Sequence, residues 1–567
     1  MNDMEVPANE GLSVLESTGP LEQRESESPA EEKTTRRSML RGSALMALLW
    51  GTDAYGQVAQ PGMQEQLPID HLDIDIVQRR CAVQVGGPSR AHRLVDKATF
   101  GFTKAELARV QTLGYNNWLT EQLDPNNVPG WAQFEADLAT VQHPTHNYGP
   151  YLTLDDLPGG QLCFENSTDV RRELVRARII RACYSPAQLF ERAVEFFTDH
   201  LNVDQRASNQ ISILKTLEDS WAIRAHALGN LKDIILASAK SPAMLLYLNG
   251  QENTSSAVNE NYARELCELH TLGDGNCYDQ ATIEVLARAL TGWRTDTSGA
   301  NCGIVSFVPG NHDDSTKTVI FPNCPGGPVQ FIIPGGLGAN EIDEVVDILT
   351  NPAKLGVETA KFVGRKLAIH FSRYDPPQAL VNAAVNAYVA NYGNNDIAAM
   401  IKVILSQKWI NCSRDKVKRP IHLLASTIRA LDGSVSDPGI ESQSSRMVGG
   451  FLSPAGHLPY QWPTPDGYND TAEYWSALFP RWDFGAALTN NEYNGVHLND
   501  IIAALAPHNT AQDTIDALDD CMFDGFMDPD DKTAILGYFG GGGPPFGDPE
   551  KRLMIGLVIG SPSFQCY

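Results

Sequence analysis

The chain has 567 residues, of which 42% are hydrophobic, so it can bury a large core. Its 69 acidic residues outnumber 44 basic ones and give a formal net charge of −25 at pH 7. Because an acidic surface repels nucleic-acid phosphates and anionic lipids, this composition excludes a general nucleic-acid-binding protein and favours a protein that its charge keeps dispersed.

The N-terminus has the composition of a targeting segment. Residues 1–33 are acidic and poor in apolar side chains, which predicts disorder. Arg36 and Arg37 precede a short apolar run over residues 44–50, and Ala54-Tyr55-Gly56 places small residues at the positions that a signal peptidase reads. The combination predicts twin-arginine export, to the periplasm or out of the cell. The alternative is a chance Arg-Arg pair before a helix.

These features divide the chain into three segments. Residues 1–56 are the disordered N-region with its signal, residues 57–90 are a linker, and residues 91–567 are a single large domain. No later segment has the roughly 20 apolar residues that a membrane-spanning helix needs, so we expect no integral membrane span.

A helical period dominates from residue 91 onward, so the expected fold class is mainly α. Thr103 followed by Glu106 is a capping-box pattern and predicts a helix through Leu113. The exception is 301–335, rich in Val, Ile, Phe, Gly and Pro, which predicts a small loop and β-hairpin insertion. Further helices are expected in 170–250 and over 341–349, 357–371, 397–407, 421–431 and 552–559.

The ten cysteines include no Cys-x-x-Cys pair, so zinc ribbons and thioredoxin-type redox motifs are not indicated. In an exported chain, an even number of cysteines permits disulfides. Cys302 and Cys324 flank a loop-rich stretch and are the first expected pair. Cys267 and Cys277 bracket a helix and a turn and are the second. Buried free thiols are the alternative.

The densest polar pattern lies in residues 259–293. A helix over 260–272 places Glu265 and Glu268 one turn apart, so both carboxylates point to the same side. Asp279 is expected to cap the next helix, whose apolar residues repeat at helical spacing. The segment is therefore predicted to be an αα-hairpin.

Seven motifs follow one another in order along the chain. The most specific group is Asn259-Glu260-Asn261-Tyr262-Ala263-Arg264-Glu265-Leu266, Glu268-Leu269-His270-Thr271-Leu272-Gly273 and Ala287-Arg288-Ala289-Leu290-Thr291-Gly292-Trp293. The others are His92-Arg93-Leu94 with Ala98-Thr99-Phe100-Gly101, Phe196-Phe197-Thr198-Asp199-His200-Leu201, Leu228-Gly229-Asn230 with Ser241-Pro242-Ala243-Met244-Leu245, His312-Asp313 with Lys317, Lys366-Leu367 with His370-Phe371, and Ser561-Pro562-Ser563-Phe564. Together they resemble the DUF1800 family, with Asp199 where that family usually has asparagine.

The resemblance implies a mainly helical, exported bacterial protein. It supplies no reaction, because the family is named as one of unknown function. Family members are often encoded beside a sulfatase-like exported family, so the resemblance suggests a sulfatase-like exported protein as a partner.

Acidic, histidine and lysine side chains of these motifs are the candidate catalytic residues, namely Glu265, Glu268, His200, His312, Asp313 and Lys317. Carboxylates on one helix, joined by His and Asp from other segments, can form an N/O site for a divalent metal that activates water. The expected ligands are His200, Glu265, His312 and Asp313. The plainer alternative is a structural ion-pair network with Arg264, satisfied core histidines and a solvated His312 turn.

Aromatic residues cluster around Trp462-Pro463-Thr464-Pro465-Asp466-Gly467-Tyr468. Trp462, Tyr468 and Trp475 are the candidate substrate-binding residues, because aromatic faces can stack on sugar rings and prolines stiffen the loop. The alternative is a set of buried aromatic side chains that close the helical core.

The favoured hypothesis is an exported enzyme that acts on a periplasmic or extracellular substrate through a His/carboxylate site, with or without a divalent metal. The alternatives are a binding or accessory protein for a sulfatase-like partner or a surface polysaccharide, and a structural envelope protein without a site. The common serine-hydrolase, zinc-protease, P-loop and dinucleotide motifs are missing, so the sequence leaves the reaction open.

Overall fold

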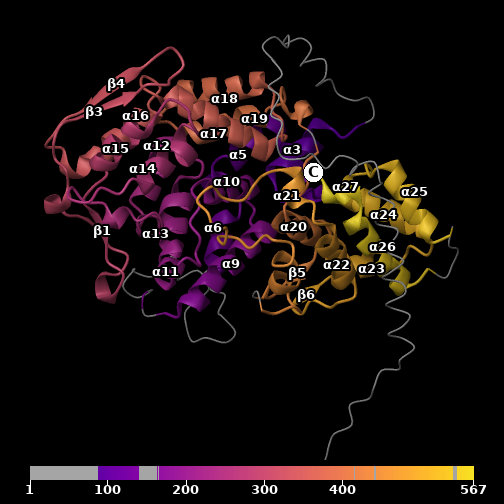
Figure 1. Ribbon diagram of the computed structural model, residues 1–567. Helices are drawn as coiled ribbons and strands as arrows, with labels where there is room; N and C mark the ends of the chain where they lie inside the picture. Colours follow the sequence, from indigo (N-terminus) through magenta and orange to yellow (C-terminus); the bar gives the residue numbers. More distant parts are fainter. Residues whose placement is uncertain (1–86, 139–162, 164, 414, 440–441, 541–545) are drawn as a thin grey trace, which may run out of the picture. The chain divides into compact units, whose positions relative to one another are not determined.

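The computed structural model describes residues 87–138, 163, 165–413, 415–439, 442–540 and 546–567. The expected signal segment and residues 57–86 of the expected linker lie outside the described residues. Helices dominate the described residues and the strands are short, which confirms the mainly α fold class (Figure 1).

The first half of the chain is almost wholly helical. Its α-helices are α3 (Arg90–Ala98), α4 (Lys104–Leu113), α5 (Tyr115–Gln122), α6 (Trp131–Leu138), α9 (Ser167–Tyr184), α10 (Gln188–His200), α11 (Asn209–Glu218), α12 (Leu231–Ala239), α13 (Pro242–Tyr247), α14 (Asn261–Glu265) and α15 (Gln280–Ala289). Two π-helical turns, η3 (Asp219–Arg224) and η5 (Leu266–Thr271), continue α11 and α14.

Two predicted helix starts are confirmed by their caps. The hydroxyl of Thr103 accepts a hydrogen bond from the backbone N–H of Glu106 and starts α4. The carboxylate of Asp279 accepts one from the backbone N–H of Thr282 and starts α15. Each cap satisfies a backbone donor that the first helical turn leaves without a partner.

In the described residues, three two-stranded antiparallel sheets interrupt the helices. They pair β1 (Trp293–Thr295) with β2 (Val305–Phe307), β3 (Lys317–Phe321) with β4 (Val329–Ile333), and β5 (Ser434–Val435) with β6 (Val496–His497). Along β3 the side chains of Lys317, Val319 and Phe321 are buried and the two between them are exposed, so one face packs against the helices. The β3–β4 pair confirms the hairpin predicted within 301–335.

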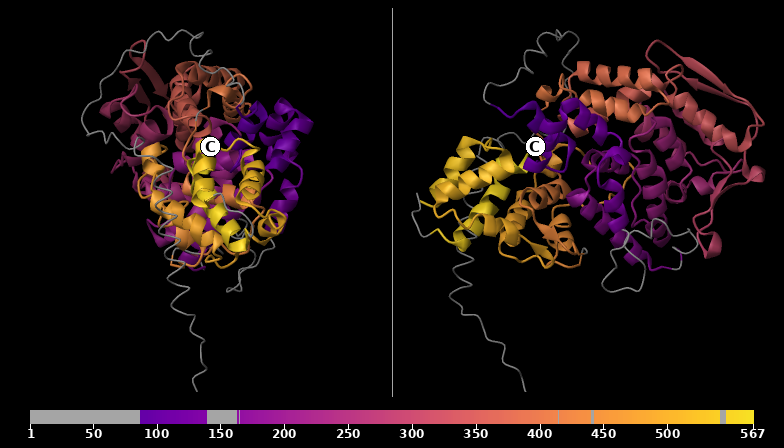
Figure 2. Two further views of the ribbon diagram at one scale, coloured as in Figure 1. Left: turned by 90° about the vertical axis from the view of Figure 1, so that its right-hand side faces the viewer. Right: turned by 180° about the vertical axis from the view of Figure 1, so that it is seen from behind.

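The second half returns to helices. They are α16 (Glu341–Thr350), α17 (Gly356–Phe371), α18 (Gln378–Asn391), α19 (Asp396–Ile404), α20 (Pro420–Ala430), α21 (Ala472–Trp475), α22 (Leu478–Thr489), α23 (Asn499–Ala504), α24 (Ala511–Phe523), α25 (Pro529–Tyr538), α26 (Asp548–Gly560) and α27 (Pro562–Gln565), with a π-helical turn η10 (Val448–Leu452). The five helices predicted here are confirmed, with ends that differ by a few residues. Figures 1 and 2 show α17, α18 and α19 side by side.

Single 3-10 turns connect several of these elements. They are η2 (Pro125–Asn127), η4 (Gly250–Glu252), η6 (Gly299–Asn301), η7 (Pro309–Asn311), η8 (Gly338–Asn340) and η9 (Ile410–Cys412). In the part of the chain that the structure describes, no helix combines the length and the apolar composition that crossing a bilayer requires.

Two large clusters of buried apolar side chains form the core. One takes in most helices from α3 to α19, and the other takes in α9, α20, α22, α24 and α26. Helix α9 contributes Val170 to the first cluster and Leu174 and Ile179 to the second. Helix α10 packs against α9, so the charged residues of α10 lie deep between helices.

The cysteine pairing differs from the prediction. A disulfide joins Cys163 to Cys302 across 139 residues of sequence. The expected pair Cys302–Cys324 is therefore wrong, and so is the pair Cys267–Cys277, because Cys267, Cys277 and Cys324 are buried free thiols. Cys324 instead lies beside Cys277. An isolated β-bridge pairs Cys277 with Asn323, the residue before Cys324, and so brings the two thiols together.

Replacing both Cys163 and Cys302 with serine is expected to lower the free energy of unfolding by about 2–4 kcal/mol, because the cut cross-link releases a long loop in the unfolded chain. Urea unfolding of the oxidised protein measures the loss. Cys521→Ser, at a partly exposed free thiol, is the control and should change stability far less. Equal midpoints for the double variant and the wild type would contradict the prediction.

Candidate functional site

Asp199 is the one residue of α10 that is not buried. Every other residue of this helix is buried, including Glu191, Arg192 and Glu195. Because a buried charge is costly unless it is paired, such a helix needs partner charges around it. The partners gather at its C-terminal end, where we define the Asp199 cluster as Asp199, His200, Lys366, Arg419 and Asp470.

Arg419 holds the two carboxylates of the Asp199 cluster. Its Nη1 donates to Asp199 Oδ2, and its Nη2 lies 3.7 Å from Asp470 Oδ2. The Arg419 side chain is 7% exposed, whereas the two carboxylate side chains are each 17% exposed. The guanidinium therefore sits on the interior side, and both carboxylates keep a route to solvent.

The two carboxylates differ in their titration. Burial raises the pKa of Asp199 to about 6, although Arg419 opposes the rise. Burial also acts on Asp470, but Lys416, whose Nζ lies 2.8 Å from Asp470 Oδ2, and Arg419 outweigh burial and lower the pKa of Asp470. Between the two pKa values Asp199 holds a proton while Asp470 stays ionised, which is the pattern of an acid and a base.

Lys366, a half-buried residue of α17, is close enough to Asp199 and Asp470 for their charges to act on its amine. Burial lowers the pKa of Lys366 to about 8, although Asp199 opposes the fall. Its Nζ donates to Nδ1 of His200 at 3.1 Å, and Nε2 of His200 donates to the carbonyl oxygen of His270 at 3.0 Å. Burial and the Lys366 charge keep the pKa of His200 well below its usual value. Both ring nitrogens therefore have hydrogen-bond partners, and His200 is placed to position Lys366.

His370 links the Asp199 cluster to the charges inside α10. Its Nδ1 lies 4.0 Å from Asp470 Oδ2, and its Nε2 lies 3.7 Å from Glu195 Oε2. Glu195 pairs with Arg192 at 2.6 Å. Burial, together with Arg192 and Arg419, keeps the pKa of His370 well below its usual value. The His370 ring is therefore neutral, and it packs between the Arg192–Glu195 and Lys416–Asp470 ion pairs.

The aromatic loop, residues 460–475, is fastened over the end of α10. The side-chain amide nitrogen of Asn202 donates to two backbone carbonyl oxygens of the loop, at 2.9 and 2.7 Å. Arg206 and Tyr247 donate to two more, at 2.6 and 2.9 Å. Four hydrogen bonds to its backbone fix the position of the loop without using its aromatic rings.

Gly467 is the point at which the aromatic loop touches α10. Its φ is +73°, a conformation that L side chains rarely adopt, and a Cβ at this position would overlap the backbone carbonyl oxygen of Asp199. The close approach of the loop to Asp199 therefore depends on glycine.

Gly467→Ala is expected to cost about 1–3 kcal/mol more than Gly456→Ala, because overlap with a fixed backbone adds to the conformational cost. Gly456 is a matched control, since its φ is also +73° and a Cβ there would meet nothing within 4 Å. Its own replacement should cost about 1–2 kcal/mol, from the left-handed conformation alone. Urea unfolding compares the two variants, and equal losses would contradict the close approach.

The three aromatic residues predicted to bind substrate lie in different environments. Trp475 is buried, and its ring packs 5.5 Å from the guanidinium of Arg419. Tyr468 is buried, and its hydroxyl donates to a backbone carbonyl at 2.8 Å. Trp462 is half-buried, and its indole N–H donates to Asp466 at 2.9 Å. Trp462 is therefore the partly exposed residue of the three, while the other two support the site from inside.

Glu265 lies at the end of α14, within electrostatic range of Asp466 in the aromatic loop. It is half-buried, and burial raises the pKa of its carboxyl, with further contributions from the charges of Glu268 and Asp466. Arg264 pairs with Glu260 at 3.0 Å, as opposite charges four residues apart on a helix do. Glu265 thus adds a carboxylate to the acidic side of the loop.

His312, Asp313 and Lys317 gather elsewhere, around the first residue of α16. Nε2 of His312 lies 3.3 Å from Oε1 of Glu341, and Nζ of Lys317 lies 2.7 Å from Oε2 of the same carboxylate. Nε of Arg288 donates to Asp313 at 2.6 Å. We call these five residues the His312 cluster.

The predicted site residues thus fall into two groups. His200 and Glu265 lie by the aromatic loop, and His312 and Asp313 lie in the His312 cluster. Among the residues with described structure, no hydrogen bond or ion pair joins the two groups. The four-ligand metal set stays a prediction without a described contact between its halves.

Sequence reasoning missed Arg419, Asp470 and Glu341, and gave Lys366 no role. Asp199 carried one usable signal, because a carboxylate in place of the family's usual asparagine needs a cation nearby. Glu341 stands in an amphipathic helix start, where an acidic residue is ordinary. Nothing in the local sequence distinguishes it.

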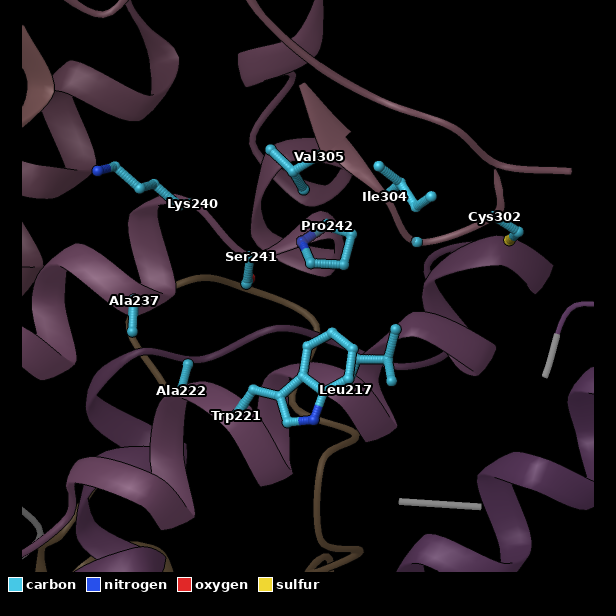
Figure 3. A pocket seen from close by; sticks show the side chains of 11 residues that line it. Leu217, Trp221, Ala222, Ala237, Lys240, Ser241, Pro242, Cys302, Ile304 and Val305 are labelled. Carbon is cyan, nitrogen blue, oxygen red and sulfur yellow. The ribbon is translucent and has the colours of Figure 1, made fainter. Parts of the chain in front are cut away.

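A separate pocket of about 350 Å³ lies between α11, α13 and residues 302–305 (Figure 3). Apolar side chains line most of it, among them Trp221, Pro242 and Ile304. Lys240 is its titratable lining residue, but the amine points away from the pocket and pairs with Asp343 at 3.0 Å. This pocket offers apolar surface without an acid or a base.

Residues 93–566 match the model of a protein family described as "Protein of unknown function (DUF1800)". No curated protein and no solved structure matches the chain.

Proposed function

The chain belongs to the DUF1800 family, as the resemblance predicted, and we propose that it is an exported hydrolase that cleaves glycosidic bonds at the Asp199 cluster. The observation that carries the proposal is the bridge made by Arg419. One guanidinium holds two partly exposed carboxylates, Asp199 and Asp470, whose pKa values are shifted in opposite directions.

Each carboxylate has a role in this reaction. Protonated Asp199 donates its proton to the glycosidic oxygen as the bond from the anomeric carbon to that oxygen breaks. Ionised Asp470 accepts a proton from the water whose oxygen attacks the anomeric carbon. One proton is given and one is taken, so the reaction balances with water as the co-substrate.

The surroundings of the two carboxylates support a sugar polymer as the substrate. The half-buried ring of Trp462 offers an aromatic face next to the cluster, and aromatic faces pack well against the apolar side of sugar rings. The amine of Lys366 can donate a hydrogen bond to a sugar hydroxyl while His200 holds its other side.

Export is part of the proposal. The disulfide between Cys163 and Cys302 supports it, because disulfides persist in oxidising compartments. The twin-arginine pattern in the N-terminal segment points in the same direction.

A panel of polysaccharides tests the proposal. Purified protein without its N-terminal signal is incubated with each polymer, and new reducing ends are measured over time. We expect release from at least one polymer and loss of release in Asp470→Asn, which keeps the side-chain shape but cannot accept the proton. Binding of a polymer without release of reducing ends would overturn the hydrolase proposal.

That outcome would favour a second function, an accessory protein that binds a surface polysaccharide for a sulfatase-like exported partner. The rigid aromatic loop is the observation behind it, because a fixed aromatic face suits binding as well as catalysis. Neither binding nor release would favour a structural envelope protein.

Trp462→Ala is expected to weaken polysaccharide affinity by about tenfold, since a stacked aromatic ring contributes roughly 1 kcal/mol or more. Affinity electrophoresis in polysaccharide gels measures the change. Trp221→Ala is the control, because Trp221 is 55% exposed and lines the separate pocket. Loss of affinity in Trp221→Ala with retention in Trp462→Ala would place the binding surface at that pocket instead.

A further inference from the structure

We propose that His312, Asp314 and Glu341 bind one divalent transition-metal ion, which fastens the loop before β3 to the start of α16. The site is independent of the proposed hydrolase site and uses a different set of ligands from the metal site expected from sequence. Asp314 and Glu341 replace Asp313 and Glu265 as the carboxylates.

The three side chains meet the first requirement of a metal site, which is convergence. One ligand atom of each residue lies within 4.8 Å of the others. Two bonds of about 2.0–2.2 Å from a central ion place their ligand atoms at most about 4.4 Å apart, so small side-chain rotations would close any wider separation around one ion. His312 and Glu341 are buried, with side chains 2% and 0% exposed, and Asp314 is exposed, so the site opens to solvent on one side.

The hydrogen bonds of His312 leave a lone pair directed at Glu341. Nδ1 lies 2.9 Å from the carbonyl oxygen of Thr291, so Nδ1 carries the proton and donates it. In the neutral ring Nε2 is then an acceptor, 3.3 Å from another acceptor, Oε1 of Glu341. Among the described residues, neither atom has a hydrogen-bond partner. A histidine that donates through Nδ1 to a carbonyl and offers Nε2 has the orientation of a metal-ligating imidazole.

The described cationic side chains around the site do not pair with all of its carboxylates, so the site can accept a cation. Lys317 neutralises Glu341 from the Oε2 side, at 2.7 Å, and also donates to two backbone carbonyls. Arg288 neutralises Asp313. Asp314 has no ion pair in the described part of the chain, and its Oδ1 accepts hydrogen bonds from the backbone N–H groups of two glycines. The two facing acceptors, Nε2 of His312 and Oε1 of Glu341, need a proton or a metal ion between them, and the carboxylate of Asp314 adds a negative charge beside them.

The ligand chemistry selects the class of ion. One imidazole nitrogen and two carboxylate oxygens suit Zn²⁺ or Mn²⁺ better than Ca²⁺, which takes oxygen ligands only. Because Asp314 also holds Gly336 and Gly338 through backbone hydrogen bonds, the ion would join three segments: the loop before β3, the turn after β4 and the first turn of α16. Its role is to fix the hairpin insertion to the helical body.

Zinc titration of the full chain by calorimetry tests the site after the protein has been stripped of metal. We expect one Zn²⁺ per chain and a rise in the melting temperature on binding. Asp314→Asn should weaken affinity at least tenfold without unfolding the protein, because the residue is exposed. Asp343→Asn, at another partly exposed carboxylate of the same region, is the matched control and should bind as the wild type does.

Two results would overturn the proposal. One is equal Zn²⁺ affinity in the wild type, Asp314→Asn and Glu341→Gln, or no binding at all. The other is a nitrogen NMR spectrum in which Nε2 of His312 carries a proton while Zn²⁺ is present, since a proton would then occupy the position assigned to the metal. Loss of hydrolytic activity plays no part in either result, so this test stands apart from that of the hydrolase.

Discussion

Asp199→Asn is expected to lower the hydrolytic rate by about 10²–10⁴-fold, which is the usual contribution of a positioned general acid. Asparagine keeps the shape of the side chain and can still accept a hydrogen bond from Arg419, so the fold should survive. The measurement is the rate of reducing-end release on the polymer that the wild type cleaves.

Asp396→Asn is the matched control for this prediction. Burial raises the pKa of Asp396 to about 6 as well, but its carboxylate accepts hydrogen bonds from the backbone N–H groups of Leu231 and Gly393, away from the Asp199 cluster. Its replacement should leave the rate per folded molecule unchanged. A similar fall in both variants would mean that Asp199 acts through stability and not as an acid.

The pH dependence of the hydrolytic rate tests independently the assignment of Asp199 as the general acid. Because the acid must hold its proton, the wild-type rate should fall as pH rises through about 6. The folded state holds this proton more tightly than the unfolded state, whose aspartate titrates near 3.9. The Asp199 contribution to stability is therefore present below about pH 4 and is lost as pH rises through 6, a dependence that Asp199→Asn removes.

Arg419→Met is expected to lower the free energy of unfolding by about 3–5 kcal/mol, the usual cost of removing one partner from a buried ion pair. Asp199 and Asp470 would lose their shared cation, and Glu195, 3.9 Å from Arg419 Nη1, would lose a second positive neighbour. Urea unfolding at pH 7 measures the loss.

Arg373→Met is the control for Arg419→Met. Arg373 pairs with Asp375, whose side chain is 78% exposed, so the cost of losing this pair should stay below about 1 kcal/mol. The deficit of Arg419→Met should also shrink as pH falls, because unpaired carboxylates in the folded variant take up protons more readily. A deficit that is independent of pH would show that the guanidinium contributes packing and not charge compensation.

Local features of the fold were predictable from the sequence. The caps at Thr103 and Asp279 depend on a hydrogen bond across three residues, which a short window contains completely. The alternation along β3 is equally local. Helix ends differed by a few residues because the terminal turns are decided by tertiary contacts outside such a window.

The Asp199 cluster was not predictable because its partners are far apart in sequence. Arg419 is 220 residues from Asp199, and no local pattern marks either Arg419 or Asp470 as its partner. The disulfide between Cys163 and Cys302 was not predictable for the same reason, because the spacing of cysteines in the sequence carries little information on a contact that closes a long loop.

The sequence prediction placed His200 and His312 in one metal site, but the hydrogen-bond partners of the two rings differ. His200 and His312 both lie in family-like motifs, but each ring has its own hydrogen bonds. His200 uses one nitrogen for Lys366 and the other for the carbonyl oxygen of His270, whereas Nε2 of His312 faces Glu341. Residue type indicated a possible ligand in both cases, and only the partners of each nitrogen distinguish a positioning residue from a metal ligand.

The cross-link between Cys163 and Cys302 bears on the order in which the protein matures. The twin-arginine route moves chains that have already folded, and thiols stay reduced before they cross the membrane. On the proposed twin-arginine route, folding alone brings these two thiols together, with their Cα atoms 6.2 Å apart, before any oxidant reaches them. On this route the disulfide takes no part in guiding assembly, and its effect comes afterwards, when it disfavours unfolding of the completed protein.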